Sequence, residues 1–317
     1  MIKLPSLNSI MNFCTTNLLI LGIGTLDFIN YSFYQNEYIY PFTLCRNEIF
    51  LYTIDYFVKD HPNIQLEDRR PKESFPFEFQ YNVVVSSAIE SFTSLLIQLF
   101  WFSHRPEALA PAHFVGVNEN MMAGARPDGP WNDIIYLIPI SFLFELIFDF
   151  FHYWTHRMLH EYPLLYRQFH KKHHQYQQPN VWITFHQHPI DLFLTNMCPT
   201  IITFWIMNRY ICPISLLQWK WINTYKTYIE ICGHTGKDIP KTCGFPQCIW
   251  LPKKLKIGLY TKDHDRHHSE NNCNYSKRFI IWDKIFGTYR GDVYQKENHE
   301  KENRLSKRTG EDVSTNK

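Results

Sequence analysis

Four apolar segments, each of about 20 residues, set the strongest limit on how this 317-residue chain can fold. They lie at approximately residues 13–33, 81–102, 134–154 and 190–211. An α-helix of that length crosses the hydrocarbon core of a bilayer. A fifth segment, at about 213–232, contains three charged residues, so it is either another span or a half-buried helix lying at the interface. The pattern predicts an all-α, polytopic membrane helical bundle with four to five spans.

A soluble protein with buried helices is the alternative interpretation. Ionised groups are costly in lipid, and Asp27, Glu90, Glu145 and Asp149 all lie inside the apolar segments. The mean hydropathy of −0.31 also looks soluble, but an average over the whole chain includes a polar C-terminal stretch and hides separate apolar segments. Segment length favours the membrane interpretation.

The distribution of basic residues predicts the orientation of the bundle. If the fourth and fifth segments form a hairpin that turns at Cys212 and Pro213, residues 155–189 and 233–317 lie on one side. The loop between the first two segments shares that side and is more basic than the opposite 103–133 loop. Its basic residues are Arg46, Lys59, Arg69, Arg70 and Lys72, against Arg105 and Arg126 in the opposite loop. Because basic loops remain in the cytosol, we expect 155–189 and 233–317 to be cytosolic.

Composition divides the chain into three parts. Residues 1–133 form an N-terminal membrane anchor with its loops, and 134–290 form a catalytic domain that contains all the histidine motifs. Residues 291–317 are charged and poor in large apolar residues, which predicts a disordered polar tail. The formal charge is only +2, and no phosphate-binding glycine motif is present, so we expect no nucleic-acid partner.

Histidine is the unusual residue, because 12 of the 16 lie between positions 152 and 268. Residues three and four apart project from one side of a helix, and three motifs have that spacing. The motifs are HYWTH with His152 and His156, HKKHH with His170, His173 and His174, and HDRHH with His264, His267 and His268. Such repeated clusters on one membrane side predict a metal site.

Further ligands are expected near the same boundary. His188 opens the fourth apolar segment and His234 follows the fifth. We rank His160 and His186 lower because neither belongs to a motif whose geometry requires it. A single zinc or facial-triad iron takes three protein ligands, so eight or more imidazoles imply two metal ions. Imidazole suits Fe, Zn, Cu and Ni alike, so spacing does not identify the element.

Carboxylates accompany the first motif on the same helical face. Glu145 and Asp149 lie one and two turns before His152. A metal-bound histidine usually donates its other ring N–H to such a group. We therefore expect Glu145, Asp149 and also Asp191 to support the metal ligands, and no catalytic residue beyond the metal centre.

These motifs resemble the three histidine boxes of the fatty acid hydroxylase/sterol desaturase superfamily. They occur in the same order as the boxes, and an apolar hairpin lies between the second and the third motif. The resemblance covers about Phe148 to Arg290 and extends to HRMLH, LYRQFHKKHH, HPID, GHTG and NYSKRFIIWDKIFGTY. Roughly the first 130 residues match nothing so specific. In this superfamily the boxes hold a non-haem di-iron centre in a membrane oxygenase.

The resemblance implies roles for the matching residues and for the whole chain. The three motifs correspond to the three boxes, and His188 and His234 fall on histidines that the family also has, whereas His186 departs from the C-5 sterol desaturase pattern. It implies two Fe ions, with Zn possible after purification, in a cytosolic helical cap of an endoplasmic-reticulum enzyme. It also implies O2, electrons from NAD(P)H through cytochrome b5 or its reductase, and hydroxylation or desaturation of a sterol, fatty acyl or sphingoid lipid taken from the bilayer.

Two other classes of protein combine apolar segments with histidines. A membrane metal transporter should place its ligands at mid-bilayer, on discontinuous helices, whereas these motifs fall beyond the spans. A metal-dependent membrane hydrolase would need neither O2 nor a reductant. The oxygenase is the favoured hypothesis.

Overall fold

The computed structural model describes residues 7–34, 36–64, 77–102, 130–176, 179–238 and 244–291. Regular structure in these ranges is helical. The long helices are α1 (Leu7–Tyr34), α2 (Ile39–Val58), α3 (Phe77–Ile97), α5 (Leu137–Glu161) and α9 (Leu216–Gly233). The short ones include α4 (Pro130–Ile135), α6 (Pro163–Leu165), α7 (Pro189–Leu192), α8 (Cys198–Ile206), α10 (Trp250–Leu255), α11 (Thr261–Glu270) and α12 (Ile281–Ile285). The predicted tail lies outside the described residues from 292 onward, and the three-part division stays a prediction.

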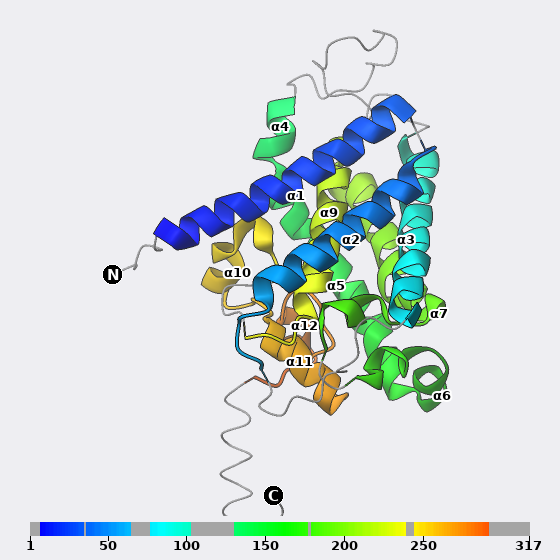
Figure 1. The fold of residues 1–317 in the computed structure, drawn as a ribbon, viewed down its shortest axis with the longest axis vertical. Coiled ribbons are helices and arrows are strands. Elements are labelled where there is room, and N and C mark those ends of the chain that lie inside the picture. Colours follow the sequence, from blue (N-terminus) through cyan, green and yellow to red (C-terminus); the bar gives the residue numbers. More distant parts are fainter. Residues whose placement is uncertain are drawn as a thin grey trace, which may run out of the picture.

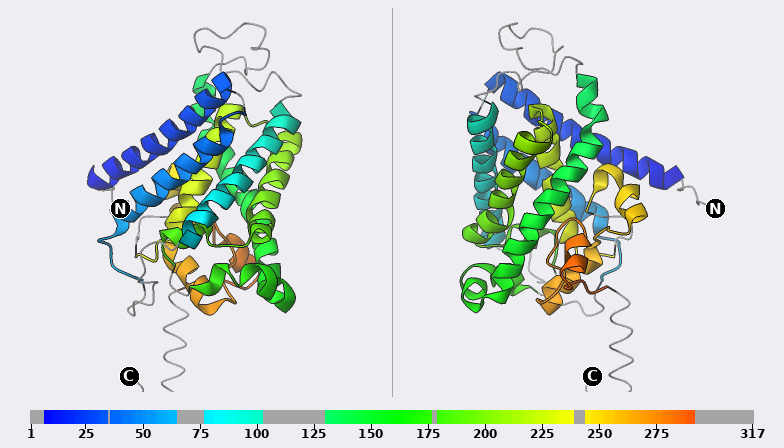
Figure 2. Two further views of the ribbon diagram at one scale, coloured as in Figure 1. Left: turned by 45° about the vertical axis from the view of Figure 1, so that its right-hand side comes forward. Right: turned by 180° about the vertical axis from the view of Figure 1, so that it is seen from behind.

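The four predicted spans are confirmed as helices. Four helical stretches are long and apolar enough to cross a bilayer: Met11–Tyr34, Glu78–Trp101, Leu137–Glu161 and Pro189–Ile211. The last combines α7 and α8 with intervening and following π-helical turns. The chain is therefore an all-α integral membrane protein. Figures 1 and 2 show the long helices side by side, with α6, α11 and α12 gathered at one end, which we call the histidine end.

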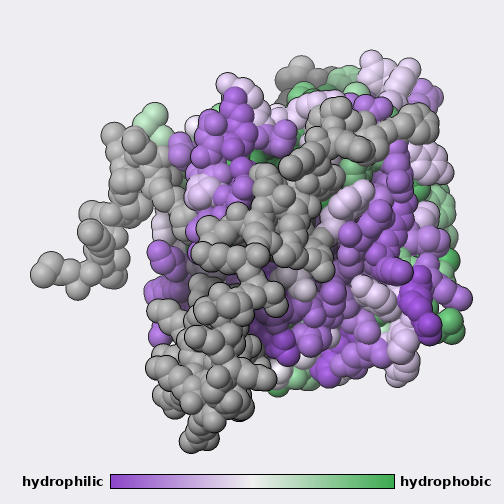
Figure 3. Space-filling view, turned by 60° about the horizontal axis from the view of Figure 1, so that its bottom comes forward, coloured by the Kyte–Doolittle hydropathy of each residue, from purple (hydrophilic) through white to green (hydrophobic). Residues whose placement is uncertain are grey.

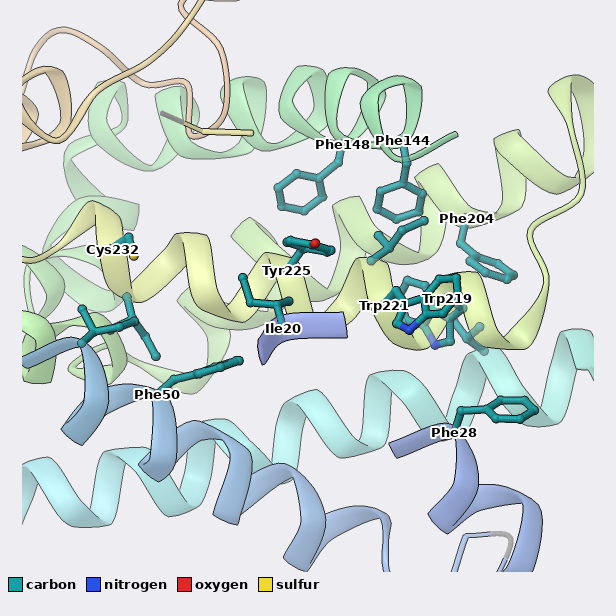
Figure 4. Close-up of a cluster of buried hydrophobic side chains, with 14 of the residues drawn as sticks. Ile20, Phe28, Phe50, Phe144, Phe148, Phe204, Trp219, Trp221, Tyr225 and Cys232 are labelled. Atoms are coloured by element: carbon teal, nitrogen blue, oxygen red, sulfur yellow. The ribbon is translucent and has the colours of Figure 1, made fainter. Parts of the chain in front are cut away.

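The fifth segment forms α9, a buried helix inside the bundle. Ser215 and Gln218 form a capping box that begins it. Trp219, Ile222 and Tyr225 are almost fully buried, and Figure 4 shows α9 residues packed among aromatic side chains of α1, α2, α5 and α8. The prediction of a half-buried helix is therefore wrong, and α9 is also not among the helical stretches long and apolar enough to cross a bilayer.

Distant partners explain why α9 is buried despite its charges. Lys220 Nζ lies 2.9 Å from Asp27 Oδ1 on α1. Lys226 Nζ lies over the Phe148 ring of α5, 3.1 Å from the ring centroid. Both cations therefore have attractive partners inside the bundle, which offsets part of the cost of burying charge.

The segment after the first span is a helix and not a loop. At 1.5 Å per residue, α2 is roughly 30 Å long. Arg46 is 1% exposed, and its Nη2 donates to Glu90 Oε2 of α3 at 2.7 Å. Arg46 is thus a buried ion-pair partner. The prediction that it lies in a loop, where its charge would help to set the orientation of the bundle, was wrong.

The end of α2 nevertheless lies beside the histidine end. Lys237 Nζ donates to the carbonyl oxygens of Lys59 and His61, at 3.0 Å in each case. Asn63 and Lys237 also form an isolated antiparallel bridge. Five other basic residues on which the predicted orientation rests lie outside the described residues: Arg69, Arg70, Lys72, Arg105 and Arg126.

Candidate metal centre

Nine histidines converge at the histidine end in two groups. Within each group, one ring nitrogen from every residue lies within 4.8 Å of the others. The five-histidine group consists of His156, His160, His170, His174 and His267, and the four-histidine group consists of His173, His234, His264 and His268. All are buried except His160, which is partly exposed. Each group has enough nitrogen donors to bind one metal ion.

Each HxxHH motif contributes to both groups. On α11, His264 and His268 are four residues apart and join the four-histidine group, while His267 joins the other. In the second motif, at 170–174, His173 alone joins the four-histidine group, and His170 and His174 join the five-histidine group. Two short helical segments therefore connect the two groups, which explains the repeated spacing.

Fixed acceptors orient four of the rings. In each case the Nδ1 atom faces a backbone carbonyl or a carboxylate, which can only accept, so Nδ1–H donates and Nε2 keeps its lone pair. The pairs are His156 with Tyr275 O at 2.8 Å, His267 with Cys273 O at 2.8 Å, His234 with Glu230 O at 2.7 Å, and His170 with Asp191 Oδ2 at 2.9 Å. This is how proteins orient metal-bound histidines.

In the five-histidine group, two Nε2 atoms then face one another without a proton between them. His156 Nε2 lies 3.1 Å from His170 Nε2, and both of these rings carry their proton on Nδ1. Two lone pairs at that distance repel unless a cation lies between them. In the second group, His234 Nε2 lies 3.0 Å from His264 Nε2. The donor set therefore fits bound metal ions.

Burial keeps the rings neutral, which is the state that binds metal. Desolvation lowers the pKa of His267 to about 3 and that of His234 to about 4. The pKa values of His173, His174 and His268 lie well below the usual value, first through desolvation and then through neighbouring histidines. Metal binding at neutral pH therefore requires no loss of protons from these rings.

Eight of the ten predicted ligands fall in the two groups, and His152 and His188 do not. His152 Nδ1 donates to Thr195 O at 2.6 Å, and its Nε2 has no hydrogen-bond partner among the described residues. His188 caps α7, where its Nδ1 accepts from Ile190 N at 3.1 Å. A helix-entry role thus accounts for His188 without a metal.

His160 lies in the five-histidine group, although the sequence analysis ranked it below the motif histidines. It lies one turn after His156 on α5, so the first pair of clustered ligands comes from HRMLH and not from HYWTH. The spacing signal was present, because His156 and His160 are also four residues apart. His186, which was also ranked low, lies elsewhere, with Asn82 and Gln175 at 3.0 and 3.1 Å from its ring nitrogens.

The three predicted carboxylates have different roles. Asp191 contacts His170 directly, as expected. Asp149 instead accepts backbone N–H groups of Lys277, Arg278 and Phe279 at 2.7, 3.0 and 2.8 Å. The prediction that Asp149 supports a ligand by direct contact was wrong, because its helical face meets a loop and not a histidine ring.

Glu145 also binds this loop, which spans residues 273–279. Its Oε2 accepts from the fully buried Arg278 Nε at 2.7 Å. The loop supplies the Cys273 and Tyr275 carbonyls that orient His267 and His156. Glu145 and Asp149 therefore position the loop that positions the ligands.

Comparisons with known proteins find relatives for this part of the chain. A fatty acid hydroxylase family model matches residues 141–288. A fatty acid hydroxylase of Lecanicillium is 32% identical over 149 residues, which cover 46% of this chain and 40% of that protein. Methylsterol monooxygenase 1 of Rattus norvegicus is 32% identical over 166 residues, covering 52% of this chain and 50% of that protein. The chain thus matches half or less of the length of these two relatives.

A third relative matches over a greater length. A Dictyostelium discoideum protein, named provisionally as a methylsterol monooxygenase, is 27% identical over 267 residues, covering 82% of this chain and 87% of that protein. No solved structure matches the chain. The family match contains all nine clustered histidines. Residues 141–288 are thus similar to the fatty acid hydroxylase family and to the sterol monooxygenases and fatty acid hydroxylases named above.

Proposed function

We propose that this protein is a membrane-bound, O2-dependent lipid oxidoreductase with a histidine-ligated di-iron centre. The observation that carries the proposal is the convergence of nine buried imidazoles in two adjacent groups at the end of a membrane bundle. Imidazole ligands suit redox-active iron, and two groups provide for two ions.

Two iron ions bound there would supply reductive O2 activation, which the amino acids themselves do not provide. For hydroxylation, one lipid C–H bond, O2, two electrons and two protons give an alcohol and one water. For desaturation, two C–H bonds break and both oxygen atoms leave as water. The electrons come from NAD(P)H, passed through cytochrome b5 or its reductase.

The protein's own contribution is to orient the ligands and exclude water. Tyr275 O, Cys273 O and Asp191 hold three rings of the five-histidine group in one orientation. Burial of nearly all the rings removes bulk water from around the centre, which protects reactive species from side reactions.

We assign the histidine end to the cytosolic face of the endoplasmic-reticulum membrane. Figure 3 views this end, and the described surface visible there is mainly hydrophilic. That polarity suits a water-facing domain that receives electrons from a soluble or surface-bound donor. The names of the relatives support lipid chemistry in general, and both sterol and fatty acid oxidation occur among them.

The proposal is tested with full-length protein purified in detergent. We expect about two irons per chain, and O2-dependent oxidation of a 4-methylsterol or a fatty acid when NADPH, cytochrome b5 and its reductase are added. Reaction without O2 or reductant would instead support a metal-dependent hydrolase. Metal transport into vesicles without lipid oxidation would support a transporter.

The matched variants are His174→Ala and His61→Ala. His174 belongs to the five-histidine group, whereas His61 is an exposed histidine at the same end of the bundle. We expect the first to lose activity and the second to retain it. Equal activity in both variants would overturn the site assignment.

A further inference from the structure

Two short helices, α10 and α12, lie together at the edge of the histidine end. Their flanking backbone segments pair, because Gly258 and Phe279 form an isolated antiparallel bridge. Lys284 Nζ of α12 also donates to the carbonyl oxygen of Lys256, directly after α10, at 3.1 Å. The two helices therefore form one structural unit.

Candidate membrane spans flank this unit on two sides. Trp250 of α10 contacts Phe13 of α1, and Phe286, directly after α12, contacts Trp154 of α5, with ring centroids 4.5 and 4.8 Å apart. Phe13 lies close to the first residue of the candidate span Met11–Tyr34. The right-hand view of Figure 2 shows α10 and α12 between the start of α1 and α5. The unit therefore lies near the level at which the first span enters the bilayer.

Large apolar side chains are exposed on both helices. Trp250 and Leu255 of α10 are 40% and 50% exposed, and Ile285 of α12 is 60% exposed. Burying apolar surface away from water is favourable, and an interfacial helix does so by placing its apolar side chains at the boundary between headgroups and acyl chains. Tryptophan is enriched at that depth. The apolar side chains therefore suit contact with lipid.

The exposed charges of the same unit are all positive, and they come from four lysines: Lys253, Lys254, Lys256 and Lys284. The acidic residue of α12, Asp283, is buried, and its carboxylate accepts from the backbone N–H groups of Tyr275 and Ser276 at 2.8 and 2.9 Å. Like charges so close together repel, and negatively charged groups outside the protein relieve the repulsion. We call these lysines, with the three exposed apolar side chains, the lysine surface.

The composition and position of the lysine surface favour a membrane over an acidic protein as its partner. Apolar side chains lie among the lysines along α10, in the order Trp-Leu-Pro-Lys-Lys-Leu-Lys, as in helices that lie at a bilayer surface. Phe13 and Trp154, which border the unit, belong to candidate spans, so lipid headgroups lie beside it as soon as the bundle is inserted. A soluble partner would have to displace those headgroups.

We propose that the lysine surface binds the headgroups of anionic phospholipids, with its apolar side chains entering the leaflet between them. The lysine ammonium groups donate hydrogen bonds to phosphate and carboxylate oxygens of the lipid. The cytosolic leaflet, to which we assigned the histidine end, carries such lipids. The inference goes beyond the proposed function, because it requires neither bound metal nor turnover.

The first test measures phospholipid binding to delipidated full-length protein in detergent by native mass spectrometry. The probes are phosphatidylserine and phosphatidylcholine. The wild type should bind phosphatidylserine at least about fivefold more tightly than phosphatidylcholine. Lys253→Gln/Lys254→Gln should lose most of this preference, whereas Lys253→Arg/Lys254→Arg should keep it. The matched control is Arg167→Gln/Lys171→Gln, which also removes two exposed cations but lies directly after α6, away from α10 (Figure 1).

Fluorescence in lipid nanodiscs gives a second readout that does not depend on the lysine charges. The emission of Trp250 is obtained as the difference between the wild type and Trp250→Phe. Phospholipids brominated on their acyl chains should quench this emission. Absence of quenching would place the lysine surface in water and overturn the inference.

Two results of the binding test would also overturn it. One is an unchanged preference for phosphatidylserine in Lys253→Gln/Lys254→Gln, and the other is an equal loss in the control variant, which would make the preference a property of overall charge. If the lysine variant keeps its lipid preference but loses binding to soluble cytochrome b5, the surface is a protein docking site instead. Failure of lipid oxidation would overturn the proposed function and leave all these measurements unaffected.

Discussion

The two histidine groups differ in how firmly the protein holds their rings. In the five-histidine group, three Nδ1 atoms donate to fixed acceptors, namely Tyr275 O, Cys273 O and Asp191. In the four-histidine group, His234 has such an acceptor, while Nδ1 of His173 and His268 has no hydrogen-bond partner in the described part of the chain. His234 and His264 of the four-histidine group also line a pocket between α9 and α11. The rings of the five-histidine group are therefore held more firmly, and those of the four-histidine group have more room to adjust.

The largest effect should follow from removing a ligand of the firmly held group. His170→Ala should reduce the iron content from about two to about one per chain and lower activity on the order of 10³-fold or more. Metal analysis and a lipid oxidation assay measure both. Retention of two irons together with full activity would mean that His170 is not an essential ligand in the five-histidine group.

A smaller effect should follow from weakening an acceptor. Asp191→Asn keeps an oxygen near His170 but removes the charge, so metal affinity or activity should fall about 10–100-fold. The second metal should keep its affinity. The exposed Asp60→Asn variant is the control. Equal weakening of both metals would contradict the separation of the two groups.

Chelation should distinguish the groups in the unmodified protein. Because fewer of its rings are fixed, the four-histidine group should lose its metal about tenfold faster than the five-histidine group on treatment with a strong chelator. Iron content against time should then show two phases. A single phase that removes both ions together would show that the difference in ring fixation has no effect on metal release.

The smallest effect is expected at His188, which the sequence suggested as a ligand. His188→Ala should lower the free energy of unfolding by about 1 kcal/mol, because it removes the side-chain cap of α7, and should leave activity within about twofold. Thermal unfolding and the oxidation assay check the two parts. A loss of iron would return His188 to the ligand set.

Sequence reasoning located the spans because apolar length is a local property. It treated the region of α2 as a loop and allowed α9 to be a half-buried interfacial helix, because the charges of both helices are compensated by residues far away in the chain. Arg46 pairs with Glu90, 44 residues later, and Lys220 pairs with Asp27, 193 residues earlier. No local pattern contains those partners.

Prediction of the site from the sequence was limited in the same way, by contacts between distant parts of the chain. The HxxHH motifs were recognisable from spacing, and eight of the ten residues named as ligands converge. The role of the 273–279 loop depends on how α5 meets a segment more than 100 residues later. Glu145 and Asp149 looked like direct partners of the histidines because helical spacing alone does not reveal that both residues bind the 273–279 loop.

The division of both HxxHH motifs has a consequence for how this centre can change. Because adjacent positions on one short helical turn belong to different histidine groups, the separation of the two groups follows from helix pitch and not from loop length. A single-residue insertion in either motif would therefore displace rings of both groups at once, whereas the substitution of one histidine changes only its own group.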